Sequence, residues 1–291
     1  MDHITPSCSQ GRSFSWQHAF DRIRQPLFTN GIVRPPGANF ADALTSVDLG
    51  APDYLRALHQ HAQYCAALER CGLTLRHLEP DERYPDSTFV EDTAVLVQVH
   101  SPSQASISCA ILMRPGAVTR AGEVASMAKV LSRFSPNMHA IEPPGTVDGG
   151  DICEAEDHFF IGISTRTNEA GARQLQKLLA LYDRTSSFVD IRGINGILHL
   201  KSGVSYLGDG RLAVIDVLSE LEDFQDYDLI RLDAGEEYAA NCVRLNNHIL
   251  IAAGYPRFEK SLRELGYETI AVEMTEFQKM DGGLSCLSLR L

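Results

Sequence analysis

The sequence predicts an α/β protein made of repeated strand, strand, helix, strand units, and three observations lead to this prediction. Apolar runs typical of strands recur along the chain, and segments with helical periodicity lie between them. Short polar segments precede the strands, and from Asp148 onward they recur about every 43–48 residues. Repetition at this period indicates one repeated structural unit. Five such units can close into a ring, and an ordinary α/β sandwich is the alternative that spacing alone leaves open.

The expected elements follow from these patterns in chain order. Strands are expected at Phe28–Val33, Thr93–Val99, Ser108–Met113, Phe159–Ile163, Gly203–Leu207, Leu212–Ile215, Cys242–Leu245, Ile249–Ala252 and Leu284–Leu289. Helices are expected at Pro52–Cys71, Ala121–Phe134, Glu169–Tyr182 and Tyr255–Leu265. Asn168 is placed to cap the third helix, and Gly72 and Gly266 are placed to end the first and the last. Residues 30–291 are expected to form one catalytic domain, because no linker divides them, and residues 1–29 an N-terminal extension.

Composition narrows the class of partner. The 291 residues carry a net charge of -12, with 44% hydrophobic and 22% charged residues. Nucleic acids and anionic membranes both favour a basic patch, so neither is expected as a partner, and a small cationic molecule suits the charge better. No apolar run approaches the roughly 18 residues of a membrane span. Residues 1–16 have no long apolar core, so no signal peptide is expected there.

The cysteines indicate free thiols. The chain has seven, an odd number, and no CxxC pair. A disulfide framework is therefore not expected. We expect the protein in a reducing compartment such as the cytoplasm. No HExxH helix or cysteine pair suggests a metal site.

Five polar segments, which we call corners, carry the residues with reactive side chains. The corners are residues 86–97, 147–163, 196–215, 239–252 and 282–291. Their carboxylates, imidazole and thiol belong to Asp86, Glu91, Asp92, Asp148, Asp151, His199 and Cys286. Each has an ordinary structural explanation, since a free cysteine packs as a small hydrophobe and Asp-Gly-Gly favours a turn. Gly282 and Gly283 distinguish Cys286, because glycine lets backbone and ligand approach closely.

Together these residue types fit the chemistry of a guanidinium group. Carboxylates bind a guanidinium through paired, charge-assisted hydrogen bonds. A thiolate can attack its carbon, and a histidine can protonate the departing amine and then activate water. The surrounding carboxylates are expected to raise the pKa of the free cysteine. A bound cationic substrate is expected to reverse that effect.

Seven motifs resemble the dimethylarginine dimethylaminohydrolase family of the guanidine-modifying, or amidinotransferase, superfamily. They are PDSTFVEDTAVL, RPGAVTRAGEV, GTVDGGDI, IGISTRTNEAGARQL, LHLKSGVSYL, YAANCVRLN and KMDGGLSCLSLRL, in family order between residues 28 and 291. The resemblance implies a five-bladed α/β-propeller, the pentein fold, with pseudo-five-fold ββαβ repeats around a central active site. It also implies hydrolysis of Nω-methylated L-arginine to L-citrulline and methylamine or dimethylamine, without a cofactor or a metal.

The resemblance assigns the chemical steps to three residues. Cys286 in GGLSC resembles the nucleophile that forms an S-alkylthiouronium intermediate. His199 in LHLK resembles the general acid and base. Asp148 in TVDGGD matches a position whose carboxylate orients the histidine or the guanidinium.

The resemblance also assigns substrate contacts. Glu91 and Asp92 resemble the carboxylates near the guanidinium, with Asp92 as the direct partner, and Asp86 resembles a contact to the amino-acid end. Arg114 and Arg166 resemble the clamp on the α-carboxylate, since arginine binds carboxylates in a two-pronged fork.

The resemblance also gives roles to one residue at the amino-acid end of the substrate and one residue in the lid. The Met280 carbonyl resembles the acceptor for the α-amine. Phe40 is expected to stand in a lid segment where the family usually has leucine, which leaves the preferred methylation state open.

Two other functions and one assembly are considered beside methylarginine hydrolysis. The main alternative is an arginine deiminase-like hydrolase, although the helical insertion of those enzymes has no room between residues 90 and 282. A non-catalytic arginine-binding module would have lost the cysteine or the histidine, and both are present. Open propeller blades often pair, so a homodimer is an assembly that this fold allows.

Overall fold

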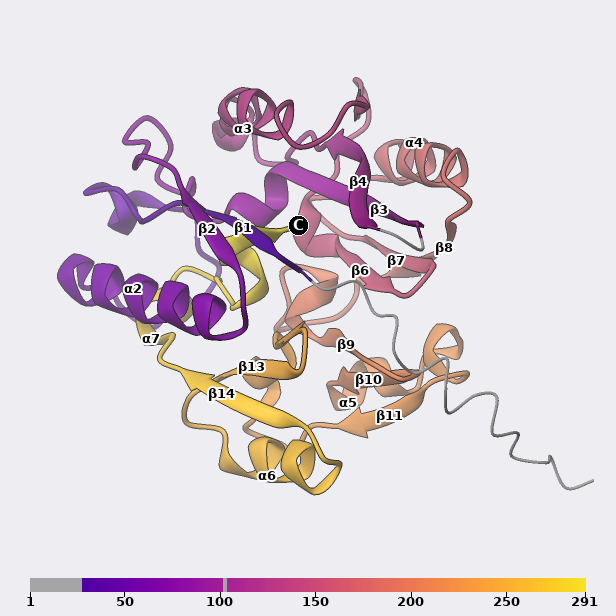
Figure 1. Cartoon of the computed structure of the whole chain (residues 1–291). Coiled ribbons are helices and arrows are strands. Elements are labelled where there is room, and N and C mark those ends of the chain that lie inside the picture. Colours follow the sequence, from indigo (N-terminus) through magenta and orange to yellow (C-terminus); the bar gives the residue numbers. More distant parts are fainter. Residues whose placement is uncertain (1–27, 102–103) are drawn as a thin grey trace, which may run out of the picture.

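Five small sheets make up the computed structural model, which describes residues 28–101 and 104–291 (Figure 1). The central strand of each sheet is antiparallel to one neighbour and parallel to the other. With the central strand in the middle, the sheets are β15 (Ser288–Arg290), β1 (Asn30–Val33) and β2 (Thr74–His77); β3 (Ala94–Ser101), β4 (Gln104–Leu112) and β5 (Met138–Ala140); β6 (Ile152–Ala155), β7 (His158–Ile163) and β8 (Thr185–Asp190); β9 (Val204–Gly208), β10 (Arg211–Val214) and β11 (Asp228–Arg231); and β12 (Val243–Leu245), β13 (His248–Ala252) and β14 (Glu268–Val272). The shared topology confirms the repeated unit that the spacing predicted.

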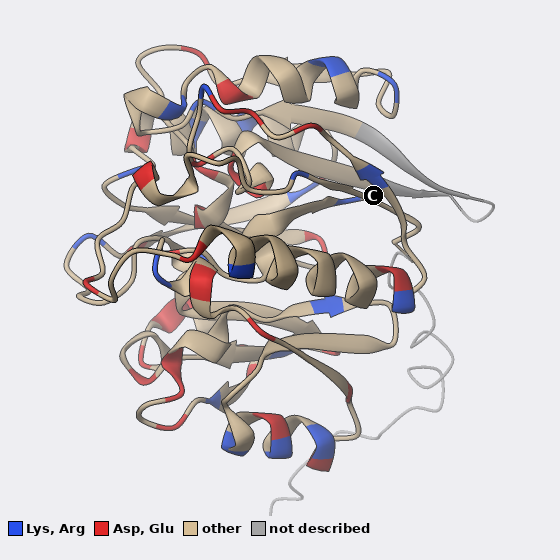
Figure 2. Ribbon diagram, turned by 90° about the vertical axis from the view of Figure 1, so that its left-hand side faces the viewer, with Lys and Arg blue, Asp and Glu red and all other residues tan. Residues whose placement is uncertain are grey.

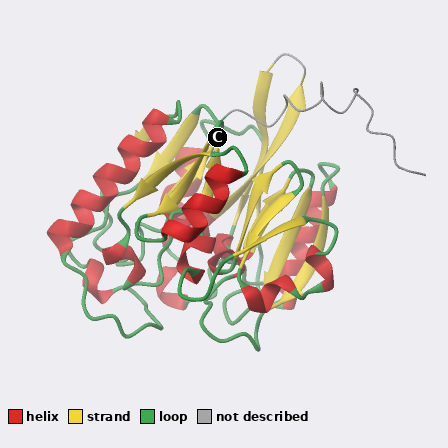
Figure 3. Cartoon of the chain, turned by 90° about the horizontal axis from the view of Figure 1, so that it is seen from below, coloured by secondary structure: helices red, strands yellow, loops and turns green. Residues whose placement is uncertain are grey.

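A helical segment connects the central strand of every sheet to its parallel neighbour, because parallel strands need a crossover connection. These helices are α2 (Tyr54–Arg70), α3 (Glu123–Leu131), α4 (Glu169–Ala180), α5 (Asp216–Ser219) and α6 (Pro256–Glu264). Figures 1 and 3 show helices on the outer side of the strands. The four expected helices are confirmed within one turn of their expected ends, while the single turn of α5 was not expected. As predicted, the Asn168 side chain caps α4 by accepting from Gly171 N.

The inner strand β6 was not predicted, and neither was the third strand of each sheet. β2, β5 and β11 have no fully buried residue, and β8 has one. β14 alternates between exposed and buried positions. These strands lie at the outer edge of their sheets, so their sequences lack the apolar runs that marked the inner strands.

Each corner contains a short 3-10 turn just before the first strand of a sheet. The turns are η3 (Val90–Thr93), η5 (Gly149–Asp151), η6 (Leu200–Ser202), η8 (Glu237–Ala240) and η9 (Ser285–Leu287). Hydrogen bonds join each corner to the next, and the last corner to the first. They run from Gly150 N to Asp92 Oδ1 (2.8 Å), Leu200 N to Asp151 Oδ1 (3.0 Å), Asn241 Nδ2 to Lys201 O (3.0 Å), Ser285 N to Asn241 Oδ1 (2.9 Å) and Ser285 Oγ to Glu91 Oε2 (2.7 Å). Side chains far apart in the sequence therefore meet at the corners.

The first sheet takes strands from both ends of the described chain. β15 pairs with β1, and the Leu291 carbonyl accepts from Thr29 N at 2.7 Å and Asn30 N at 2.9 Å. The buried Tyr64 hydroxyl of α2 lies 2.7 Å from Ser288 Oγ. The strand that follows Cys286 is thus fixed to the first sheet and its helix.

Some predictions concern the surface and the chain outside the corners. The six cysteines among the described residues are free, as expected. Within the described part of the chain, no helix is long and apolar enough to cross a membrane. Figure 2 shows acidic residues in many loops at its left-hand edge, in keeping with the net charge of -12. Most of the expected N-terminal extension, residues 1–27, lies outside the described residues.

Candidate active site

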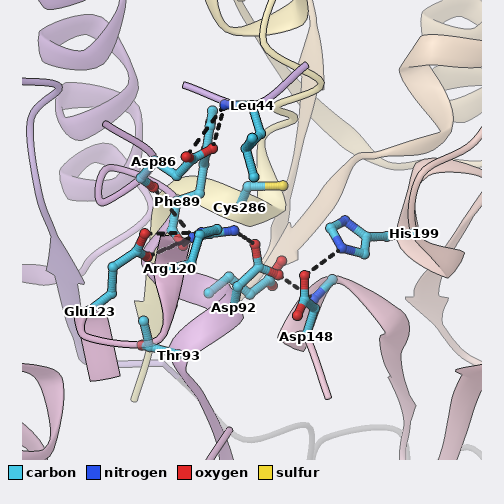
Figure 4. A network of polar contacts seen from close by, with 12 residues as sticks. Leu44, Asp86, Phe89, Asp92, Thr93, Arg120, Glu123, Asp148, His199 and Cys286 are labelled. Atoms are coloured by element: carbon cyan, nitrogen blue, oxygen red, sulfur yellow. Dashed lines mark hydrogen bonds and ion pairs between the residues drawn. The ribbon is translucent and has the colours of Figure 1, made fainter. Parts of the chain in front are cut away.

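A small pocket brings together residues from the first, third and fifth corners (Figure 4). Its volume is about 20 Å³. Its walls are formed by Leu44, Asp86, Phe89, Asp92, Arg120, Arg166, Leu198, His199, Met280, Asp281, Gly282 and Cys286. The pocket thus unites a thiol, an imidazole, carboxylates and two guanidinium groups.

His199 is held by a carboxylate from the second corner. Its Nε2 lies 3.0 Å from Asp148 Oδ2, and the other Asp148 oxygen accepts from Gly116 N at 2.8 Å (Figure 4). Asp148 is completely buried. Because Nε2 faces Asp148, Nδ1 is the ring nitrogen that faces away from this carboxylate. It lies beside Gly150, where an added Cβ would come within 2.7 Å of it.

The carboxylates around His199 favour its charged form. Burial lowers the pKa of His199, but Asp151, Asp92 and Asp148 outweigh burial and raise the pKa to about 9. At neutral pH the imidazole is therefore protonated, as a general acid must be before it donates.

Cys286 lies in η9, and its sulfur lies 3.5 Å from Gly283 N, which donates to it. Burial, followed by the charges of Glu91 and Asp92, raises the pKa of the thiol to about 12. This confirms the expected effect of the surrounding carboxylates. The resting cysteine is a neutral thiol at neutral pH, so a cation bound beside it would be needed to favour the thiolate.

Gly282 and Gly283 are required by packing against protein side chains. A Cβ on Gly282 would lie 2.3 Å from the Phe89 ring, and one on Gly283 would lie 2.5 Å from Asn241 Cγ. These glycines were expected to make room for a ligand, and Gly282 does line the pocket. The structure adds that both glycines let the loop before Cys286 pass close to Phe89 and Asn241.

Asp92 is the pocket carboxylate with the most direct partners. Its Oδ2 lies 2.5 Å from Arg120 Nη1, and its Oδ1 accepts from Gly150 N. Burial opposes its charge, but Arg120 and His199 lower the pKa of Asp92 below its ordinary value. Arg120 also pairs with the buried Glu123 at 2.8 Å. Asp92 is therefore an ionised group held in a fixed position at the pocket.

Arg120 lines the pocket but was not among the predicted residues, which included Arg114 as part of the clamp on the α-carboxylate. Arg114 does not line the pocket, because its Nη1 donates to Gly145 O at 3.0 Å. Both arginines belong to the motif RPGAVTRAGEV. A signal was present, since Arg120 stands three residues before Glu123 and can form an (i, i+3) pair with it.

Arg166 does line the pocket, as predicted. Its backbone N–H donates to Ser164 Oγ at 2.9 Å, which fixes the loop between β7 and α4. Met280 also lines the pocket, from the loop after α7 (Thr275–Gln278).

The lid residue at the pocket is Leu44. Its N–H donates to Asp86 Oδ1 at 3.1 Å, so the lid backbone contacts the carboxylate expected to bind substrate (Figure 4). Phe40 is completely buried, with its ring centre 5.4 Å from that of Phe277 and 6.0 Å from that of Phe89. The structure corrects the expectation for Phe40, which packs in the core outside the pocket wall.

Glu91 lies on the other side of the first corner. Its Oε1 is 2.6 Å from both Lys201 Nζ and Arg290 Nη2, and its Oε2 accepts from Ser285 Oγ. These four residues line a second cavity of about 170 Å³. Glu91 is absent from the wall of the small pocket, so it acts on Cys286 through its charge and through Ser285.

One group of described residues has the composition of a metal site. Ligand atoms of Asp92, Asp148 and His199 lie within 4.8 Å of one another. These atoms already form hydrogen bonds and an ion pair with protein groups. A cation could bind here only by displacing the Asp148–His199 contact or the Arg120–Asp92 pair.

The chain is similar to known proteins in both sequence and structure. No family model matches the chain. An N(G),N(G)-dimethylarginine dimethylaminohydrolase from Pseudomonas aeruginosa is 42% identical over 265 residues, covering 91% of this chain and 100% of the relative. A protein of the same name from Streptomyces coelicolor is 33% identical over 266 residues, covering 89% of this chain and 96% of the relative.

Solved structures give the same result. The Pseudomonas aeruginosa enzyme, as a cysteine-to-serine variant complexed with citrulline, matches with a TM-score of 0.85 and 41% identity over 91% of this chain and all of that one. A histidine-to-glycine variant of a dimethylarginine dimethylaminohydrolase, solved as an adduct with S-methyl-L-thiocitrulline, matches with a TM-score of 0.84 over the same shares. The N-terminal domain of a cyanobacterial arginine dihydrolase, 17% identical with a TM-score of 0.74, shares the fold over 90% of this chain and 97% of that one.

Proposed function

The chain belongs to the dimethylarginine dimethylaminohydrolase family, and from this premise we propose how its residues hydrolyse Nω-methylated L-arginine to L-citrulline and an amine. Cys286 is the nucleophile, His199 the general acid and base, and Asp148 the residue that orients His199. The solved relatives with citrulline and a thiocitrulline adduct carry replacements of a cysteine and a histidine. These are the two residue types that face each other in this pocket.

The first half of the reaction releases the amine. Asp92 pairs with the substrate guanidinium, whose positive charge lowers the pKa of the Cys286 thiol, and the thiol proton leaves to solvent. The thiolate attacks the guanidinium carbon and forms a C–S bond. His199 gives its Nδ1 proton to the methylated nitrogen, the C–N bond breaks, and an S-alkylthiouronium intermediate remains.

The second half uses the same residues in reverse roles. Neutral His199 takes a proton from a water molecule, and the resulting hydroxide attacks the thiouronium carbon. The C–S bond then breaks, the hydroxyl proton passes to the leaving sulfur of Cys286, and L-citrulline is released with the resting thiol restored. Asp148 keeps the ring orientation through both halves by its 3.0 Å contact to Nε2.

The remaining pocket residues are proposed to hold the amino-acid end of the substrate. Arg166 attracts the α-carboxylate, whereas Arg120 is engaged with Asp92 and Glu123 and holds them in place. Asp86 and the Met280 carbonyl receive the α-amine. Leu44 covers the pocket as part of the lid, and its hydrogen bond to Asp86 must yield when substrate binds.

The architecture we propose for this site is a five-bladed α/β-propeller, formed as one domain by residues 30–291. Five sheets of one topology and the cycle of hydrogen bonds between the corners support it. A propeller explains why residues as distant as Asp92, His199 and Cys286 share one pocket, since equivalent corners face a common axis.

The observation that carries the function is the meeting of Cys286, His199 and Asp92 in one buried pocket. The test supplies asymmetric dimethylarginine, monomethylarginine, arginine and agmatine separately and measures the ureido product. Turnover of the methylated arginines is expected to exceed that of arginine. Faster turnover of arginine than of both methylated forms would favour the arginine deiminase-like alternative.

A matched pair of variants tests the nucleophile. Cys286→Ser is expected to lower turnover by more than about 10³-fold, because a hydroxyl is a far weaker nucleophile at neutral pH. Cys242→Ser, at another buried free cysteine, is the control and is expected to retain turnover once folded. Equal activity of both variants would remove the assignment of Cys286.

A further inference from the structure

Asp151 is a completely buried carboxylate that lies outside the pocket wall and has no part in the steps above. Its Oδ1 accepts from Leu200 N at 3.0 Å, and Leu200 directly follows His199. Its Oδ2 accepts from Ser164 Oγ at 2.6 Å. One carboxylate therefore holds the backbone beside the general acid and, through Ser164, a second loop.

The second loop is the one that carries Arg166. Besides donating to Asp151, Ser164 Oγ accepts from Arg166 N at 2.9 Å and from Thr167 N at 3.0 Å. The Thr167 hydroxyl in turn accepts from Asp148 N at 3.1 Å. A continuous set of hydrogen bonds thus links the Arg166 loop to both Asp148 and the backbone at His199.

Asp151 also acts on His199 through its charge. After burial, which lowers the pKa of His199, the charge of Asp151 is the largest single contribution and raises it, and Asp148 acts through both a hydrogen bond and its charge. Burial raises the pKa of Asp151 itself, while His199 and the Ser164 hydrogen bond oppose that rise. The pKa of Asp151 stays above its ordinary value, and hydrogen bonds to its oxygens, such as those from Ser164 and Leu200, favour the charged form that acts on His199.

We propose that Asp151 is a positioning residue that couples binding of the substrate carboxylate at Arg166 to the orientation and protonation of His199. The proposal rests on the proposed function for the roles of Arg166 and His199. When the Arg166 loop closes on a carboxylate, Ser164 and Asp151 hold the backbone at Leu200. The backbone that carries the acid is thus held more firmly when a complete amino-acid substrate is bound.

The first test is Asp151→Asn, which keeps an oxygen for Leu200 N and removes the charge. Loss of the charge on a residue that holds the backbone beside the catalytic histidine is expected to lower kcat by about 10- to 100-fold. The pKa of His199, followed by NMR of ¹⁵N-histidine-labelled protein and assigned with a His199→Gln variant, is expected to fall from about 9 toward its ordinary value. Asp190→Asn, at an exposed carboxylate paired with Arg192, is the control and should change neither quantity.

The second test is Ser164→Ala, which keeps the Asp151 carboxylate and breaks its link to the Arg166 loop. It is expected to raise KM for methylarginine several-fold and to lower the pKa of His199 by less than Asp151→Asn does. The double variant should lose little more activity than Asp151→Asn alone, since both changes break one connection.

The outcomes separate this proposal from the proposed function. The NMR titration uses resting protein, so it reports on Asp151 whether or not methylarginine is turned over. An unchanged pKa of His199 in Ser164→Ala and Asp151→Asn, or fully additive losses in the double variant, would overturn the coupling. If Asp151→Asn does not fold, an unchanged KM and His199 pKa in Ser164→Ala would overturn it equally.

Discussion

Glu91 and Asp92 are neighbours in the chain, yet they lie on opposite sides of the first corner and have different surroundings. Asp92 borders the small pocket with Cys286 and His199. Glu91 borders the second cavity, where Lys201 and Arg290 both lie 2.6 Å from it. Asp92 is paired with Arg120 beside the pocket that holds Cys286 and His199, whereas Glu91 is neutralised by contacts that hold the first, third and fifth corners together.

This difference shows that neighbouring residues of one 3-10 turn can contribute to catalysis and to stability. Because adjacent positions of the turn point to different sides, Asp92 lines the pocket, held by Arg120 and Gly150, while Glu91 is engaged in an ion-pair network on the other side. Changes on the pocket side should therefore affect turnover, and changes on the other side should affect the free energy of unfolding.

The largest effect is expected on the pocket side, from His199→Gln. Loss of a general acid and base typically lowers turnover by about 10²–10⁴-fold. Citrulline formation at saturating methylarginine measures it, and circular dichroism checks that the variant is folded. A kcat within fivefold of the unaltered protein would contradict the role of His199.

A change on the opposite side, Glu91→Gln, should act mainly on stability. It leaves Lys201 and Arg290 close together without their common anion, and loss of one partner of a buried ion pair costs about 3–5 kcal/mol. Urea unfolding measures the free energy of unfolding. Glu264→Gln, which breaks an exposed pair with Lys260, is the control and should cost less than about 1 kcal/mol. Equal costs for the two variants would show that the network is not stabilising.

A smaller effect is expected from shortening the pocket arginine. Arg166→Lys loses the two-pronged geometry toward a carboxylate, which corresponds to about 1.5–3 kcal/mol, or roughly 10- to 150-fold in KM. Arg114→Lys is the matched change in an arginine outside the pocket wall and should leave KM unchanged. Initial rates over a range of methylarginine concentrations compare them. A larger increase in KM for Arg114→Lys would restore the original assignment.

The most gradual effect is expected for the reactivity of the free Cys286 thiol, which should change steadily with pH. Because the pKa of Cys286 is raised to about 12, the thiolate is the minor form at pH 7 and its fraction rises about tenfold per pH unit below that value. Alkylation of Cys286 by iodoacetamide between pH 7 and 10, followed by mass spectrometry, should show this slope. A plateau of the alkylation rate below pH 8 would contradict the raised pKa of Cys286. Methylarginine analogues that bind without reacting should increase the alkylation rate at pH 7.

The sequence predicted the inner part of the fold better than the outer part. Inner strands such as β7 and β13 are buried almost throughout, so their apolar runs stand out. Outer strands such as β2 and β11 expose most of their residues and are stabilised by pairing with a central strand, which leaves little trace in composition. The corners could be recognised because their spacing and residue types repeat.

The site was predicted where a residue type is unusual and missed where neighbours are interchangeable. Asp148 and His199 contact each other as the assigned roles require. Arg114 and Arg120 occupy one motif, and only the turn before α3 determines which side chain reaches Asp92. Phe40 and Leu44 likewise share one segment, and the packing of Phe40 against Phe89 and Phe277 decides which one reaches the pocket.

The pairing of β15 with β1 has a consequence for how the active site is lost. Cys286 stands in the turn directly before β15, and β15 is held by β1 and by Tyr64 of α2. Separation of these two strands would displace the nucleophile while the other four sheets remain intact. Inactivation on mild heating can therefore precede global unfolding, and amide hydrogen exchange at Ile32 and Leu289 should follow the same time course as the loss of turnover.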